Sequence, residues 1–179
     1  MSIRSPSPFC GGTLLSSRPV LTAAHCRTSV SLFLVHVGEH DVTIADGEQK
    51  IRPTSFISHP QYNSGTNDND FAIITLSREV PFSCTIMPVC LPTPGSNYDS
   101  QDATVTGWGT LASGSNEVPK TLNEVDVDTI SNTACTTNTL YQPGTITNNM
   151  LCARSSGKDS CQGSQIYSKF LQIYYLICR

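Results

Sequence analysis

Short apolar runs separated by turn-forming residues make up the pattern of this chain. Residues 31–37 place Phe33, Val35 and Val37 on one face of a predicted strand, because side chains two positions apart share a face of an extended chain. Residues 71–76 (FAIITL) are apolar on both faces and predict a buried strand. The first half of the chain is therefore predicted to contain β-structure.

The second half carries the same signal in shorter segments. Residues 124–128 alternate acidic residues with valine, the pattern of a half-exposed strand. Residues 149–153 predict another short strand that ends at its cysteine. Ser131 or Asn132 can cap a short helix running toward Leu140, because their side chains accept hydrogen bonds from the free N–H groups of a first helical turn.

Turns rich in proline and glycine separate these segments, most densely at residues 92–102. Such a stretch is typical of a linker, so we expect it to join two lobes. Together with the strand patterns, it predicts an all-β protein in two halves.

Charge narrows the range of partners. The 179 residues include 11 Lys and Arg against 14 Asp and Glu, which gives a formal net charge of −3. There is no run of Lys or Arg, so nucleic acid and anionic membranes are excluded as expected partners. No apolar stretch approaches the ~20 residues of a membrane-spanning helix.

Cysteine usage indicates where the protein works. An even, widely spaced set of eight cysteines predicts disulfides and an extracellular, secreted protein. The first residues lack the apolar core of a signal peptide, so we interpret the beginning as incomplete. No Cys-x-x-Cys pair favours structural zinc. The cysteines are Cys10, Cys26, Cys84, Cys90, Cys135, Cys152, Cys161 and Cys178.

Two segments carry candidate chemistry. In residues 10–26 (CGGTLLSSRPVLTAAHC), two cysteines can close a loop and hold the imidazole of His25, as general-base catalysis requires. Asp70 lies at the mouth of the predicted buried strand, where a carboxylate can orient a histidine and stabilise its imidazolium. Taken singly, His25 also fits a core histidine, and Asp70 fits a strand-end cap.

Set beside the segment 156–163 (SGKDSCQG), these two resemble the chymotrypsin–trypsin family of serine endopeptidases, from Phe9 to Gly163. Five motifs occur in the family's order: LTAAHC, DFAII, TGWGT, MLCAR and KDSCQG. The resemblance implies two antiparallel six-stranded β-barrels, the second incomplete. Residues 1–95 would form the first barrel and residues 96–179 a partial second one, in a single peptidase domain truncated at both ends. Residues 164–179 do not look like the family.

The resemblance also implies roles for individual residues. His25 would be the general base and acid, and Asp70 would hold its tautomer and orientation. Asp159 would lie at the base of the primary specificity pocket and select Lys or Arg side chains by ion pairing. Gly163 would supply one backbone N–H of the oxyanion hole.

Disulfides and a metal loop follow from the same resemblance. It implies the bridges Cys10–Cys26 and Cys135–Cys152, whereas Ala103 stands where many members have another cysteine. Cys84 and Cys90 either bridge each other, or Cys90 reaches a cysteine further upstream.

The loop at residues 38–49 resembles the calcium loop of some trypsins, with Glu39 and Glu48 as carboxylate ligands. We favour solvated surface charges for both, and expect no other cofactor and no other metal. Three histidines without a motif partner are expected to be strand or surface residues: His36, His40 and His59.

The family pattern fails after the CQG motif. The family continues DSGGP, and this chain continues SQIY, which puts Gln165 in the place of the nucleophilic serine and Ser164 in that of the preceding aspartate. A carboxamide cannot lose a proton and attack a carbonyl. The glycines that permit the strained turn at the family's serine are missing around Ser164, so we do not expect Ser164 to act as the nucleophile instead.

Three functions remain. By family, the protein is a trypsin-like endopeptidase that cleaves after Lys or Arg, with protein or peptide substrates and protein protease inhibitors as partners. The chain as written is expected to be inactive. The alternative is a non-catalytic homologue that acts as a binding or regulatory module. The third is no function as a protein, because an incomplete barrel exposes unpaired strand edges.

Overall fold

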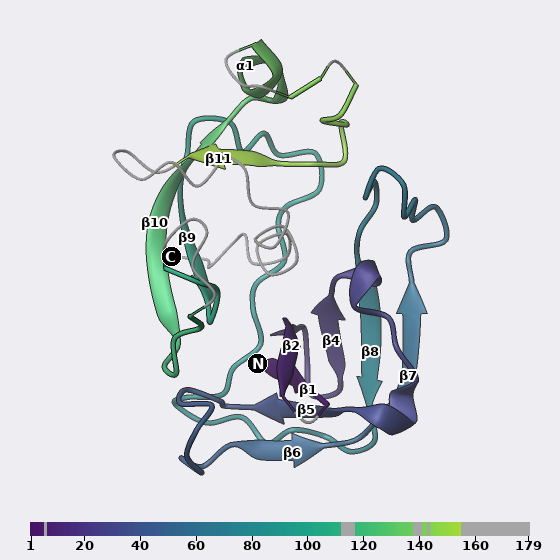
Figure 1. Cartoon of the computed structure of the whole chain (residues 1–179), viewed down its shortest axis with the longest axis vertical. Coiled ribbons are helices and arrows are strands. Elements are labelled where there is room, and N and C mark those ends of the chain that lie inside the picture. Colours follow the sequence, from purple (N-terminus) through teal and green to yellow (C-terminus); the bar gives the residue numbers. More distant parts are fainter. Residues whose placement is uncertain (6, 112–116, 138–140, 143, 155–179) are drawn as a thin grey trace.

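The computed structural model contains eleven strands, one α-helix and two 3-10 helices (η1 and η2) in the part of the chain that it describes (Figure 1). The strands form three antiparallel sheets, which confirms the all-β, trypsin-like fold class, although the described strands leave the sheets open rather than closed into barrels. The described residues are 1–5, 7–111, 117–137, 141–142 and 144–154.

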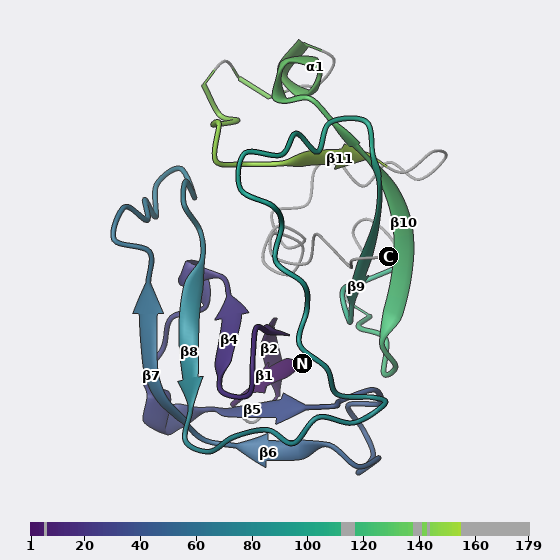
Figure 2. The same cartoon turned by 180° about the vertical axis from the view of Figure 1, so that it is seen from behind.

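The first four-stranded sheet has the order β2-β1-β5-β6. Its strands are β1 (Ser2–Arg4), β2 (Pro8–Gly11), β5 (Leu34–Val37) and β6 (Gln49–Ile51). The second sheet has the order β3-β4-β8-β7. Its strands are β3 (Thr13–Leu14), β4 (Pro19–Thr22), β8 (Ala72–Leu76) and β7 (Pro53–Ser58). β5 and β6 run across one end of β4, β8 and β7, as both views show (Figures 1 and 2).

One apolar core lies between these two sheets. From the first sheet, Ile3, Val35 and Ile51 are at most 2% exposed, and from the second, Val20 and Ile74 are fully buried. Alternation along each strand explains the arrangement, since every second side chain faces the partner sheet. Burial of this apolar surface is the main favourable term that holds the first half together.

The apolar face predicted for residues 31–37 is confirmed, because Phe33, Val35 and Val37 are all buried. The strand itself is shorter than predicted. It begins at Leu34, since residues Val30–Leu32 form η2.

The strand predicted at residues 71–76 is β8, one of the two interior strands of the second sheet. Its inner face is closed, with Ala72, Ile74 and Leu76 at most 1% exposed. The outer face is only half-buried, which differs from the prediction. The reason is that Ile73 lies beside Ile57 of β7, which is exposed to solvent and covered by no other described segment.

The third sheet has the order β11-β10-β9. β9 (Asp102–Gly107) and β10 (Asn123–Ile130) pair over six residues, so the half-exposed strand predicted at 124–128 is confirmed and is longer than expected. β11 (Cys152–Arg154) begins at the cysteine where the predicted strand was to end. A turn closed by the Met150 N–H on the Thr147 carbonyl (3.2 Å) precedes it and accounts for the shift.

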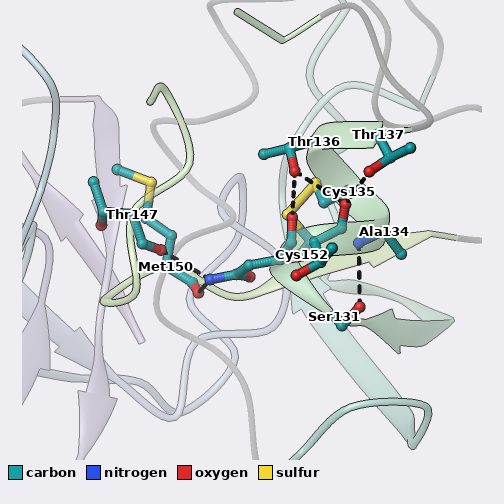
Figure 3. Close-up of a disulfide and its surroundings, with 10 residues drawn as sticks. Ser131, Ala134, Cys135, Thr136, Thr137, Thr147, Met150 and Cys152 are labelled. Carbon is teal, nitrogen blue, oxygen red and sulfur yellow. Dashed lines mark hydrogen bonds between the residues drawn. A yellow bond between two sulfur atoms is a disulfide. The ribbon is translucent and has the colours of Figure 1, made fainter. Parts of the chain in front are cut away.

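The helix α1 (Asn132–Thr137) starts where the polar residues predicted it. Ser131 is the cap, because its hydroxyl accepts the Ala134 N–H at 3.2 Å (Figure 3). A disulfide then joins Cys135 of α1 to Cys152 of β11 (Figure 3). The other end of the predicted helix, Leu140, lies outside the described residues.

The two halves meet at the turn that follows β5. The Trp108 indole N–H donates to the His40 carbonyl (3.0 Å), which also accepts the Leu122 N–H (2.8 Å). Gly38 makes the turn possible, because its φ of +77° lies in the left-handed region and a Cβ there would come within 2.9 Å of Ile86. The segment between β8 and β9 contains no strand or helix and includes the predicted linker except its last residue, Asp102, which begins β9.

We predict that Ile74→Ala destabilises the protein by about 2–5 kcal/mol, because it leaves a cavity in the closed core. Ile57→Ala is the matched control, since the same side chain at this site of β7 is 64% exposed and should change the free energy of unfolding by less than about 0.5 kcal/mol. Urea unfolding of both variants measures the difference. Equal losses would contradict the assignment of the core.

Candidate active site

The register between β4 and β8 brings two distant residues together. Thr22, the last residue of β4, pairs with Ala72, the first residue of β8. His25 follows Thr22 in η1 (Ala24–Cys26), and Asp70 precedes Ala72. Because the strands are antiparallel, the chain leaving β4 and the chain entering β8 lie at the same end of the sheet.

His25 and Asp70 make two contacts across this end. The Asp70 Oδ2 lies 2.6 Å from the His25 Nδ1, and Oδ1 accepts the His25 backbone N–H at 2.8 Å. The Asp70 side chain is only 3% exposed, whereas the imidazole is 16% exposed. A buried carboxylate that accepts both bonds fixes the ring's orientation and can stabilise a positive charge on it.

A disulfide holds η1 from the other side. Cys26, next to His25, is joined to Cys10 of β2, with 6.2 Å between their Cα atoms. Thr22 adds a bond from its hydroxyl to the Gly11 carbonyl (2.8 Å). The histidine is therefore positioned by the β4–β8 ladder on one side and by the first sheet on the other.

The loop from His59 to Asp70 contributes residues that the motifs do not single out. Tyr62 is half-buried there, and burial, with a smaller effect of the Asp70 charge, raises the pKa of its phenol above the usual value. Asn67 and Asn69 adopt left-handed conformations with φ of 57° and 54°, which asparagine tolerates better than most residues. The sequence signal for this loop is its density of asparagine and aspartate.

Asp68 connects this loop to the second half of the chain. Its Oδ1 accepts the Thr147 hydroxyl at 2.5 Å and the Asn149 amide at 3.2 Å. The Thr147 hydrogen bond is the largest cause of a lowered pKa for the Asp68 carboxyl. The segment before β11 thus contacts the loop that carries Asp70.

A cleft of about 410 Å³ opens beside His25. Arg27, His59, Tyr62 and Ser64 also line it, together with the half-buried Ser58. Among the described residues, no acidic side chain lines the cleft, and the histidine ring borders it, so a bound molecule could reach the imidazole.

The loop at residues 38–49 brings three carboxylates together, with one oxygen each from Glu39, Asp46 and Glu48 within 4.8 Å of one another. Glu39 is not the solvated surface charge that we favoured from the sequence, because it is only 5% exposed. Its Oε2 lies 3.3 Å from the Arg4 Nη1 and 3.2 Å from the His36 Nδ1. Its Oε1 is buried without a hydrogen-bond partner among the described residues.

His36 is a buried member of this cluster. Burial, followed by the nearby charge of Arg4, lowers the pKa of His36 below its usual value. The ring is therefore neutral at pH 7 and donates its Nδ1–H to Glu39. His36 lies in β5, and His40 and His59 lie in loops, as expected for strand or surface residues.

Several predicted residues lie outside the described part of the chain. These are Asp159, Gly163, Ser164, Gln165, Cys161 and Cys178. Cys84 and Cys90 are both exposed, and neither forms a disulfide with another described residue, so the first alternative, a bridge between them, is not formed. Ala103 lies in β9 and faces Val127 of β10.

Comparison with known proteins identifies the family to which this chain is related. The family model for trypsin matches residues 1–164. Trypsin alpha of Drosophila melanogaster is 39% identical over 160 residues, which cover 89% of this chain and 62% of that protein. Trypsin-3 of Salmo salar is 41% identical over 165 residues, 90% of this chain and 67% of that protein.

This chain belongs to the trypsin family of serine proteases. It spans about 62% of the length of the Drosophila relative and about 67% of that of the salmon relative. Within the described ranges, no helix is long and apolar enough to cross a membrane.

We predict a pH effect at Asp68. Its pKa is lower in the folded state than the ordinary 3.8, so folding is favoured above that pH, and the contribution is lost as the pH falls through the lowered folded value. Asp68→Asn removes the titrating group, so the free energy of unfolding should fall less steeply with acid in this variant than in the unchanged chain. Urea unfolding between pH 6 and pH 3 checks this. Asp41 and Glu48, which also have lowered pKa values, are present in both proteins. Parallel curves would contradict the prediction.

Proposed function

We propose that this chain carries the base and the orienting acid of a trypsin-like serine endopeptidase that cleaves proteins or peptides after Lys or Arg. The observation that supports it most strongly is the pair formed by His25 and Asp70, with Nδ1 and Oδ2 2.6 Å apart beside an open cleft. With Nδ1 engaged by the carboxylate, the chemistry expected of His25 takes place at Nε2.

In this proposal each residue has one task. His25 accepts the proton of a serine hydroxyl and returns it to the leaving amine, while Asp70 keeps the tautomer that makes this transfer possible. Asp159 pairs with the positive side chain of the substrate. The Gly163 N–H donates to the oxygen that becomes negative in the tetrahedral intermediate.

The domain organisation belongs to the same proposal. Residues 1–95 would form the first barrel and residues 96–179 part of the second. The two disulfides of the described chain support an extracellular location, because such bonds persist in oxidising compartments. Protein protease inhibitors would then be natural partners beside substrates.

Gln165 supports a second candidate. If this residue stands where the family has its nucleophile, the chain as written hydrolyses nothing, because an amide side chain is not a nucleophile of this kind. The chain would then act as a non-catalytic homologue, a binding or regulatory module. The two candidates differ in the sequence that follows Gly163 in the expressed protein.

We predict that sequencing of full transcripts from the source tissue finds DSGGP after Gly163. The protein encoded by that transcript should hydrolyse Arg and Lys esters. His25→Ala should then lower kcat by more than about 10⁴-fold and Asp70→Asn by roughly 10⁴-fold, since both remove the oriented base. His40→Ala is the matched control, because its side chain is exposed on a turn outside the cleft and its change should leave kcat unaltered.

A different result would separate the candidates. If the abundant transcript reads SQIY after Gly163 and the soluble 179-residue chain leaves these esters intact, the peptidase proposal fails and the binding module stands. Hydrolysis that survives His25→Ala would contradict the roles proposed for the pair.

We also propose that Ca²⁺ binds the carboxylates of Glu39, Asp46 and Glu48. Hard oxygen ligands on a loop suit this ion, and the buried, unpartnered Oε1 of Glu39 offers one. A bound cation would link the loop to the end of β5 and offset the repulsion among three negative charges. No catalytic step involves it.

For this site we predict that calcium at ten times its dissociation constant raises the melting temperature by roughly 3–5 °C, since the ion binds only the folded chain. Asp46→Asn should remove most of the gain. Glu79→Gln, a change at an exposed acid outside the loop, should keep it. The site is absent if Asp46→Asn and the unchanged chain respond equally in thermal unfolding.

A further inference from the structure

In the first sheet, the strands β1, β5 and β6 have an outer face that the peptidase function does not use. Their inner face holds Ile3, Val35 and Ile51, which pair across the three strands and pack into the core. Because side chains alternate, the neighbours of these residues point away from the core. The outer face is therefore defined by the same register.

Basic residues gather on that outer face. Arg4 pairs with Leu34, and His36 pairs with Lys50, so directly opposite residues bring all four to one side of the sheet. Arg52 lies two positions after Lys50 and continues the row. Arg4 of β1, the neutral His36 of β5, Lys50 of β6 and Arg52, which directly follows β6, thus lie along one side of the sheet.

These side chains line a groove of about 560 Å³. Its remaining described lining is apolar or carries hydroxyl groups, including Ser31 and Leu32 of η2, and no described acidic side chain belongs to it. Leu32 is 62% exposed, which leaves an uncovered apolar surface next to the charges. The groove shares no lining residue with the cleft beside His25.

Three acids lie near the groove, and of these only Asp46, which lies beside Glu39 and Glu48, is exposed. The Glu39 side chain has no exposed surface and the Glu48 side chain is 5% exposed, so neither presents its charge to solvent as the bases do. Glu39 fixes Arg4, and Glu48 pairs with Lys50, whose side chain stays 53% exposed. The exposed Arg52 forms no ion pair with a described residue. The positive charge that a molecule in the groove meets is therefore that of Arg52, with the exposed but ion-paired Lys50 two positions before it, although the whole chain has a net charge of −3.

We propose that this groove binds an acidic peptide segment of another protein, with carboxylates on Lys50 and Arg52 and an apolar side chain against Leu32. Charge complementarity selects the carboxylates, and the exposed leucine favours a peptide over a simple anion or a sulfated sugar, which would leave it in water. The groove is independent of His25, so it serves a peptidase or a non-catalytic homologue equally.

The test uses the whole 179-residue chain at fixed calcium and a fluorescein-labelled peptide in which glutamates flank each leucine. Fluorescence anisotropy measures its dissociation constant. Each of Lys50→Ala, Arg52→Ala and Leu32→Ser should weaken binding about three-fold, and the two basic changes together roughly ten-fold. Added salt should weaken binding as well.

Controls separate this groove from general attraction. Lys120→Ala removes an exposed cation outside the groove and should leave binding unchanged. Lys50→Arg with Arg52→Lys keeps the charges and should retain binding, which excludes a folding defect. The proposal is overturned if Lys120→Ala weakens binding as much as the groove variants do, or if the double alanine variant binds as tightly as the unchanged chain. Equal competition by inorganic phosphate or a heparin fragment of the same charge, with no effect of Leu32→Ser, would also overturn it in favour of a simple anion site.

Discussion

The ladder between β4 and β8 is the contact on which both the core and the site depend. Val20 and Ile74 face each other in its middle and are fully buried, so the ladder is held by apolar packing as well as by backbone hydrogen bonds. The same register sets Thr22 against Ala72, and from there only short segments lead to His25 and Asp70. A slip of one residue would turn the apolar set outward and also separate the pair, so selection for a stable core preserves the geometry of the site.

The burial of the Asp70 carboxylate costs free energy that the surrounding structure must offset. A carboxylate that is only 3% exposed has lost most of its water, and its burial is tolerated only if hydrogen bonds replace that water. The His25 backbone N–H and Nδ1 supply two of them, which binds the acid to both the main chain and the ring of one residue. The orientation of the imidazole is therefore linked to the folding of the segment that carries it. The disulfide between Cys10 and Cys26 reduces the freedom of that segment further.

The alternation of apolar and polar residues predicted the strands that are buried on one face. It failed where local hydrogen bonds determine where a strand begins. The face of Phe33, Val35 and Val37 could be predicted because alternation survives in the fold. The start of β11 at Cys152 could not, since a turn closed by Met150 and Thr147 has no apolar signature. The ordered motifs identified His25 and Asp70 as candidates, but neither Tyr62 nor Asp68 belongs to a motif. Only the structure shows that Tyr62 lines the cleft and that Asp68 accepts a hydrogen bond from Thr147. The burial of Glu39 could not be predicted either, because it depends on contacts with Arg4 and His36, and the sequence around Glu39 shows only a polar loop.

The strand β5 contributes to both the apolar core and the groove on the outer face of the sheet. Its inner residues join the core that supports the β4–β8 ladder, while Leu34 and His36 belong to the basic groove on the outside. Because the two sets alternate along the chain, substitutions on the outer face can change charge without opening a cavity in the core. Glu39, two residues after the same strand ends, limits this freedom. Removing Arg4 would leave the buried Glu39 carboxylate without a guanidinium partner, whereas Lys50 and Arg52 are exposed and can vary. The specificity of the groove should therefore change through Lys50 and Arg52 rather than through Arg4.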